Sequence, residues 1–184
     1  MTREQAAANR ERVVDAASML FRRHGFDGVG VADIMKAAGL THGGFYGQFD
    51  SKEDLAAEAC AHARRDSWQA WKDVPRAERL PGIVRSYLTP RHRDNREAGC
   101  LFAALGSDVV RQPRPVRRAF TERVRGKLDM LRDAVRGRSE QARRDKAIAT
   151  LSGLVGALIL SRAVDDAALS DEILEAAART YEQF

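Results

Sequence analysis

Apolar positions recur with a helical period almost everywhere along the chain. Val13, Ala17 and Leu20 lie three and four residues apart, which places them on one face of a helix expected over residues 3–24. A second apolar stripe predicts a helix over residues 31–38. Runs of β-branched residues with a period of two do not occur, so the pattern predicts an all-α protein.

Prolines, glycines and capping residues divide the rest of the chain into further helices. The expected boundaries are a long helix over 51–71, a break at Pro75 and Pro81, and helices over 83–88, 101–111, 113–136, 139–164 and 170–184. Ser139 and Ser170 are the expected N-caps of the last two helices. The charged segment 89–99 is expected to be an exposed loop. The whole chain is expected to hold about nine helices.

The segment from Gly39 to Ser51 has the layout of a helix-turn-helix. Gly39 is expected to end one helix in a left-handed conformation, and Thr41 is expected to cap the next. Ser51, with Asp54 three residues later, resembles a capping box for the helix after that. Only about nine residues lie between the caps, so packing has to hold the short helix in place.

Three glycines make this short helix unusual. Gly43, Gly44 and Gly47 leave one of its faces without side chains. Leu40, Phe45 and Phe49 supply the apolar contacts. A bare helix end that is held firmly suits close approach to the backbone of another molecule.

Composition limits the classes of function. The net charge is +5, but residues 61–138 hold 19 Lys and Arg against 9 Asp and Glu, while the first 60 residues hold 7 against 9. The basic excess therefore lies outside the helix-turn-helix, and an argument for DNA binding has to rest on local geometry. The ordinary explanation of the Arg-rich middle is a solvated helix face.

Other features argue against an enzyme, a metal centre or a secreted protein. The two cysteines, Cys60 and Cys100, form no CxxC motif, and the four histidines show no ligand spacing. We expect no cofactor and no catalytic residues. The polar start of the chain is no secretory signal, and the apolar stretch 151–160 is too short for a bilayer, so a cytoplasmic protein is expected. A helical enzyme, or a scaffold built on the Arg-rich middle, would leave the glycine-rich segment unexplained.

Residues from about 12 to 55 resemble the DNA-binding domain of the tetracycline-repressor (TetR/AcrR) family. The matching stretches are Ala16-Ala17, Leu20-Phe21, Gly25-Phe26, Asp33-Ile34, Ala37-Ala38-Gly39, Gly43, Phe45-Tyr46, Phe49 and Ser51-Lys52-Glu53. Gly99-Cys100-Leu101 is similar to the ligand domain of one branch of the family. Gly44 and Gly47-Gln48 depart from the family pattern, which usually has larger side chains there.

The resemblance implies a domain organisation and a mechanism. Residues 1–50 would form a three-helix helix-turn-helix domain, and residues 51–184 a helical domain that binds an effector and dimerises. The implied function is a repressor: a homodimer binds a palindromic operator in double-stranded DNA, and a small-molecule effector releases it.

Seven residues are the candidate DNA contacts. They are Thr41, His42, Gly43, Gly44, Tyr46, Gln48 and Lys52. Tyr46 and Lys52 are expected to reach phosphate oxygens, while His42 and Gln48 are able to meet base edges. Gly43 and Gly44 would expose N–H groups to phosphate, and Thr41 acts as a cap whether or not it touches DNA. Arg3, Arg10 and Arg12 are further candidates for reading DNA shape.

Large apolar side chains in the middle of the chain are the candidate walls of an effector pocket. The set is Trp68, Trp71, Tyr87, Cys100, Phe102, Phe120 and Met130. The alternative for each is an ordinary core position. Cys100, close to an expected helix start, is also a candidate redox or electrophile sensor with a lowered thiol pKa.

The last two helices are the candidate dimer interface. The helix over 139–164 is apolar on every side between residues 147 and 160, so it needs burial on two sides. Burial inside a larger core is one solution, and a second copy of the chain is the other, with Gly153 and Gly156 allowing close approach. The candidate interface residues are Leu151, Val155, Leu158, Ile159, Ile173, Leu174 and Ala177.

Overall fold

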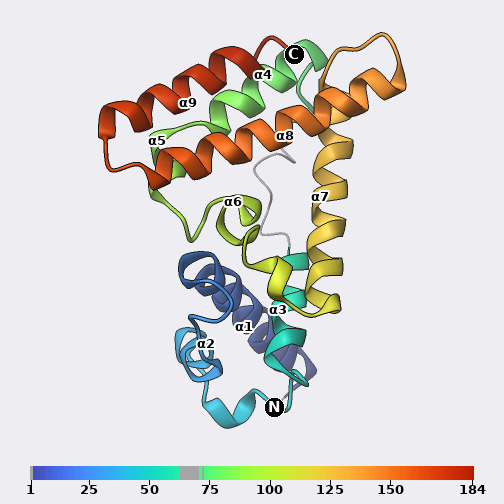
Figure 1. Cartoon of the computed structure of the whole chain (residues 1–184). Coiled ribbons are helices and arrows are strands. Elements are labelled where there is room, and N and C mark those ends of the chain that lie inside the picture. Colours follow the sequence, from blue (N-terminus) through green and yellow to red (C-terminus); the bar gives the residue numbers. More distant parts are fainter. Residues whose placement is uncertain (1, 63–70, 72) are drawn as a thin grey trace. The chain divides into compact units, whose positions relative to one another are not determined.

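The computed structural model describes residues 2–62, 71 and 73–184, and every regular element among them is a helix (Figure 1). The predicted all-α fold is confirmed. The chain divides into two compact units. One comprises Met1–Arg64 with Ala104–Arg123, and the other comprises Arg65–Ala103 with Val124–Phe184.

The first unit holds the N-terminal helices. They are α1 (Arg3–His24), α2 (Val31–Ala37), the 3-10 helix η1 (His42–Gly44) and α3 (Lys52–Ala61). Both α2 and α3 pack against α1. Apolar side chains from all three, among them Val13, Ile34 and Leu55, are fully buried. The three-helix arrangement expected for the N-terminus is therefore present.

The boundaries of α1 match the sequence prediction, because local signals set both ends. Thr2 caps the helix by accepting a hydrogen bond from the N–H of Gln5 at 3.2 Å. Gly25 ends it with a backbone φ of 78°, a value that residues with a side chain rarely adopt.

The helix expected over 51–71 is shorter than predicted. It begins as expected, with Ser51 accepting from the N–H of Asp54 at 3.0 Å. It stops at Ala61, because the backbone of His62 is extended, with ψ of 108°. The His62 ring instead turns to Asp15 of α1, with Nε2 3.0 Å from Oδ1. Residues 63–70 of the expected helix lie outside the described residues.

The remaining helices run from Arg76 to Tyr181. They are α4 (Arg76–Tyr87), α5 (Pro90–Asp94), α6 (Leu101–Leu105), η3 (Val109–Arg111), α7 (Arg114–Ala134), α8 (Glu140–Ala163) and α9 (Ala167–Tyr181). In the second unit α8 and α9 lie side by side, joined by a short turn, and α4 also contacts α9 (Figure 1).

Four local expectations in this part are wrong. Pro81 lies inside α4 instead of ending a helix, and buried Leu80, Ile83 and Val84 hold that helix in place. The expected loop 89–99 contains α5, which Thr89 caps. The expected helix 101–111 is interrupted between α6 and η3.

The fourth error concerns the start of α9. The helix begins at Ala167 with Asp166 as its N-cap, while the predicted cap, Ser170, lies one turn inside. Ser170 is buried, and its hydroxyl donates to the carbonyl of Ser161 at 2.6 Å. Its polar group therefore joins α9 to α8 instead of starting a helix.

Among the described helices, only α8 is long and apolar enough to cross a bilayer, as judged by length and composition alone. The sequence prediction considered only the apolar stretch 151–160, which is too short for a bilayer, whereas α8 as a whole has 24 residues. The inner face of α8 packs on α9, where Leu154 and Leu158 are fully buried. The core helix of a soluble protein has the same properties.

Candidate nucleic-acid interface

The segment between α2 and α3, residues 39–49, turns as the sequence predicts but contains less helix. Gly39 adopts φ of 68° and lets the N–H of Leu40 bond back to the carbonyl of Met35 at 2.9 Å. The expected short helix is one 3-10 turn, His42–Gly44, followed by a non-helical turn. Thr41 is the N-cap residue of this turn, as predicted, but its side chain makes no capping hydrogen bond. Its carbonyl accepts from the N–H of Gly44 at 3.1 Å.

Aromatic packing holds this segment against the first unit. Phe45 and Phe49 are buried and stack with ring centroids 5.5 Å apart. Tyr46 is 69% exposed, and the edges of the Phe45 and His42 rings meet it in T-shaped contacts. Tyr46 thus presents a hydroxyl to solvent, while the neighbouring rings of Phe45 and Phe49 hold its backbone in place. Its contact with a phosphate stays a prediction.

Gly43 and Gly44 differ in what surrounds them. A side chain at Gly43 would meet nothing within 4 Å, so this glycine leaves an open surface. A Cβ at Gly44 would lie 3.6 Å from Cε of Met35 and 3.9 Å from Oγ1 of Thr41. Gly44 therefore faces the side chain of Met35 in α2, and Gly43 is the position where a partner molecule has room to approach.

Gln48 is turned away from the surface. Its Nε2 donates to the carbonyl of Gly44 at 3.0 Å, and its Oε1 is buried without a hydrogen-bond partner in the described part of the chain. In this conformation the amide does not reach outward to a base edge. His42 is exposed, and Lys52 is half-buried in the first turn of α3. The DNA-binding roles of these three side chains stay predictions.

Two arginines make long-range contacts that the sequence did not predict. Arg10 donates to the carbonyl of Gln48 and to Glu58, and Arg12 donates to the carbonyl of Ala38. Partners 26 to 48 residues away leave no periodic signal in the sequence, so these contacts were not predictable from it. Arg3, the third basic residue suggested for shape readout, is exposed.

Comparison with known proteins decides the nature of this unit. Residues 13–59, from α1 to α3, match the family of bacterial regulatory proteins, tetR family. The N-terminal helices are therefore similar to those of the TetR family. The HTH-type transcriptional regulator AcrR of Shigella flexneri is 37% identical over 57 residues, which cover 31% of this chain. The chain spans only 26% of the length of that curated relative.

Solved structures match nearly the whole chain. A regulator from Agrobacterium tumefaciens superposes with a TM-score of 0.78 at 19% identity, covering 96% of this chain and 98% of its own. The reduced form of Escherichia coli NemR does so with a TM-score of 0.79 at 20% identity, covering 96% of each chain. At such identities the likeness shows the fold. The matched family, the AcrR relative and the Agrobacterium tumefaciens protein are named as regulators.

The predicted effector-pocket residues do not gather in one described cavity. Trp68 lies outside the described residues. Trp71 is half-buried against α4, where a side chain at Gly82 would lie 2.2 Å from its ring. An open hollow of about 520 Å³ borders Trp71 together with Glu78, Gly82, Arg85 and Ser86. Tyr87 and Phe102 are buried, and Phe120 and Met130 are half-buried. Their roles in binding an effector stay predictions.

Cys100 belongs to a polar network around α5. Its backbone N–H donates to Nε2 of His92 at 3.0 Å, and the other ring nitrogen lies 2.7 Å from the carbonyl of Tyr87. Because a carbonyl only accepts, His92 carries its proton on Nδ1 and is neutral. Burial lowers the pKa of His92 below its ordinary value of 6.5. Burial also raises the pKa of the Tyr87 hydroxyl, and the neighbouring Cys100 side chain raises it further.

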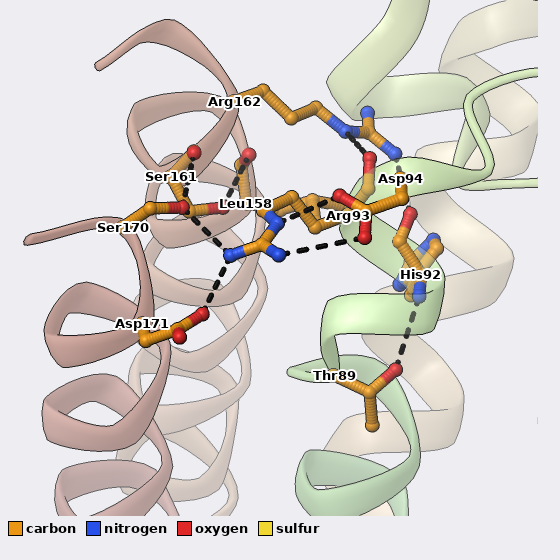
Figure 2. A network of polar contacts seen from close by, with 9 residues as sticks. All are labelled: Thr89, His92, Arg93, Asp94, Leu158, Ser161, Arg162, Ser170 and Asp171. Atoms are coloured by element: carbon orange, nitrogen blue, oxygen red, sulfur yellow. Dashed lines mark hydrogen bonds and ion pairs between the residues drawn. The ribbon is translucent and has the colours of Figure 1, made fainter. Parts of the chain in front are cut away.

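Arginines join this network to α8 and α9, as Figure 2 shows. Arg162 donates to the carbonyls of Arg93 and His92 at 2.9 and 2.8 Å. Arg93 reaches Asp171 at 2.6 Å and Ser170 at 2.9 Å. The network therefore fixes α5, and with it the position of Cys100, against the α8–α9 turn. The other cysteine, Cys60, is buried, which raises its thiol pKa to about 12 and makes it unreactive.

The predicted dimerisation residues divide into two groups. Leu151, Leu158 and Leu174 are buried within the single chain, while Ile159 is 42% exposed. Val155, Ile173 and Ala177 are half-buried. Gly153 is covered by Tyr181 of the same chain, whereas a side chain at Gly156 would meet nothing within 4 Å. Of the two glycines, only Gly156 leaves open space for a second helix.

Proposed function

We propose that the chain is a transcriptional regulator that binds double-stranded DNA through the segment 39–49. The observation that carries this proposal is the 69% exposure of Tyr46 beside the open surface at Gly43, both mounted on the buried rings of Phe45 and Phe49. A large aromatic side chain that is exposed on a firmly packed segment is suited to an intermolecular contact. Its hydroxyl can donate to a phosphate oxygen, and the missing side chain at Gly43 lets the DNA backbone come close.

The regulator acts as a homodimer on a palindromic operator. An exposed apolar stripe on α8 supports this part of the proposal. Ile148, Ile159 and Leu160 are each 42–56% exposed, and with Gly156 they lie on one face of the helix. A stripe of this kind is suited to packing against its own copy across a two-fold axis. Two identical helix-turn-helix units related by that axis would read two half-sites of opposite orientation.

A small-molecule effector regulates the binding, and the regulator acts as a cytoplasmic repressor that the effector releases. The half-buried indole of Trp71 beside an open hollow supports an effector site in the second unit. Effector and DNA then weaken each other's binding by the same factor, because a coupling free energy is reciprocal.

Selection of duplexes from a random library, followed by titration at several salt concentrations, tests the proposal. The wild-type protein should enrich an inverted repeat. Tyr46→Phe should weaken binding to selected and random duplexes alike, because a phosphate contact carries no sequence information. Tyr181→Phe removes a hydroxyl from the other compact unit and serves as the matched control. Failure of the wild-type protein to bind any duplex at low salt would refute the proposal.

A thiol trigger at Cys100 is the second candidate for release from DNA. The hydrogen bond from the Cys100 backbone to His92, within a network that reaches α8 and α9, favours it. The structure of NemR, similar in fold, is named as that protein's reduced form. If oxidation of Cys100 is the trigger, peroxide should release wild-type protein from DNA and leave Cys100→Ser bound. Peroxide without effect on the wild-type protein would leave only the small-molecule effector.

A further inference from the structure

Arg10 of α1 reaches the C-terminal end of the segment 39–49 with its whole guanidinium group. Nη1 donates to the carbonyl of Gln48, and the group lies 4.2 Å from the centroid of the Phe49 ring. Nη2 bonds to Oε2 of Glu58 in α3 at 2.5 Å. One side chain thus connects α1, the segment and α3, which the planar fork of arginine allows and a lysine ammonium does not.

Arg12, two residues further along α1, holds the other end of the segment. Its Nη2 donates to the carbonyl of Ala38, the C-cap residue of α2, and Nη1 bonds to Asn9 at 3.3 Å. Ala38 directly precedes Gly39, where the chain turns. The backbone carbonyls at both ends of the segment are therefore bound by arginines of the same helix.

The segment needs such support because its own backbone provides little. Its only regular element is a three-residue 3-10 helix with two glycines, and a helix this short is not stable by itself. Phe45 and Phe49 anchor its inner side, and the two arginines add a hydrogen bond to the backbone at each end. Small shifts in a group that contacts a partner are costly to recognition, so the two ends matter for the placement of His42, the exposed side chain of the segment that is able to meet a base edge.

We infer that Arg10 and Arg12 are positioning residues of the DNA interface, which fix the recognition segment on α1 and make no contact with DNA themselves. This inference rests on the proposed function. It differs from a phosphate-binding role in its chemistry, because the guanidinium donors named above are occupied by protein carbonyls and a carboxylate. Removal of either arginine then changes how well the segment fits one sequence and leaves the number of phosphate contacts unchanged.

Titration of Arg10→Ala with two duplexes distinguishes these roles. One is a 30-base-pair duplex selected by the wild-type protein from a random library, and the other is an unrelated duplex of the same length. Affinity for the selected duplex should fall about 10-fold or more, the loss typical of removing a charge-assisted hydrogen bond. Affinity for the unrelated duplex, and the slope of log Kd against log salt concentration, should stay as in the wild type. An equal loss on both duplexes, with the slope reduced by about one, would show a phosphate contact instead.

Arg10→Lys separates geometry from charge. Lysine keeps the positive charge but loses the fork that joins the Gln48 carbonyl, Phe49 and Glu58, so it should not restore affinity for the selected duplex. Full restoration by lysine would overturn the inference.

Hydrogen exchange of the DNA-free protein gives a readout that does not depend on the proposed function. Amides of residues 41–48 should exchange faster in Arg10→Ala, whereas Arg3→Ala, which removes the same charge from an exposed position of α1, should leave them unchanged. Unchanged exchange in Arg10→Ala would refute the positioning role. A wild-type protein that binds no duplex, combined with faster exchange in this variant, would refute the proposed function and leave the contact itself established.

Discussion

Replacement of Leu160 by arginine should convert the proposed dimer into folded monomers. Leu160 is 56% exposed in the single chain, so the substitution costs the monomer little. Burying a whole leucine side chain contributes about 1.5–3 kcal/mol, and the exposed part of Leu160 accounts for roughly half of that. The two-fold axis places this residue in the interface twice, so the lost apolar contact alone amounts to about 1.5–3 kcal/mol per dimer.

The introduced charge adds to this loss. Enclosing an unpaired guanidinium in an apolar contact costs several kcal/mol for each ion. The total exceeds about 5 kcal/mol, which raises the dissociation constant of the dimer by more than about 1,000-fold. Sedimentation velocity at micromolar concentration should therefore show a dimer for the wild type and a monomer for Leu160→Arg, with the same helical circular dichroism.

Two control variants make the experiment decisive. Val110 is 64% exposed on η3, outside α8 and α9, so Val110→Arg should remain a dimer. Leu158 is fully buried within the chain, so Leu158→Ala should lower the free energy of unfolding by about 2–5 kcal/mol without a specific effect on association. A Leu160→Arg protein that stays dimeric would refute the proposed interface, and so would a Val110→Arg protein that becomes monomeric.

Three further outcomes are expected. Lys52→Ala should reduce the slope of log Kd against log salt concentration in DNA titrations by about one, and an unchanged slope would exclude a contact of Lys52 with phosphate. Gly43→Val should abolish DNA binding while the melting temperature stays close to that of the wild type, because its side chain enters open space; wild-type affinity would show that this glycine faces no partner. The lowered pKa of His92 means that below pH 6.5 the unfolded chain takes up a proton that the folded chain does not, so the free energy of unfolding should decrease as pH falls. The decrease is at most about 1.4 kcal/mol per pH unit, and denaturant titrations of His92→Gln should show it diminished; an identical pH dependence would contradict the assignment.

Features with a local cause were readable from the sequence. The helix α1 has the predicted ends, because a capping threonine and a glycine with positive φ lie within a few residues of them. Gly39 and the caps at Ser51 and Ser139 were found for the same reason. The helical period of the apolar residues likewise sufficed for the all-α fold.

Features that depend on distant partners were decided only by the tertiary structure. Ser170 resembles an N-cap in sequence, but its hydroxyl bonds to Ser161 of the neighbouring helix. Gln48 was a candidate for base recognition, yet its amide is folded back onto the carbonyl of Gly44. In the sequence Arg10 has no apparent partner, but in the fold α3 and the segment 39–49 place Glu58 and the Gln48 carbonyl within hydrogen-bond distance of it. A side chain with several possible hydrogen-bond partners takes those that folding brings close, and periodicity and capping rules describe only neighbours along the chain.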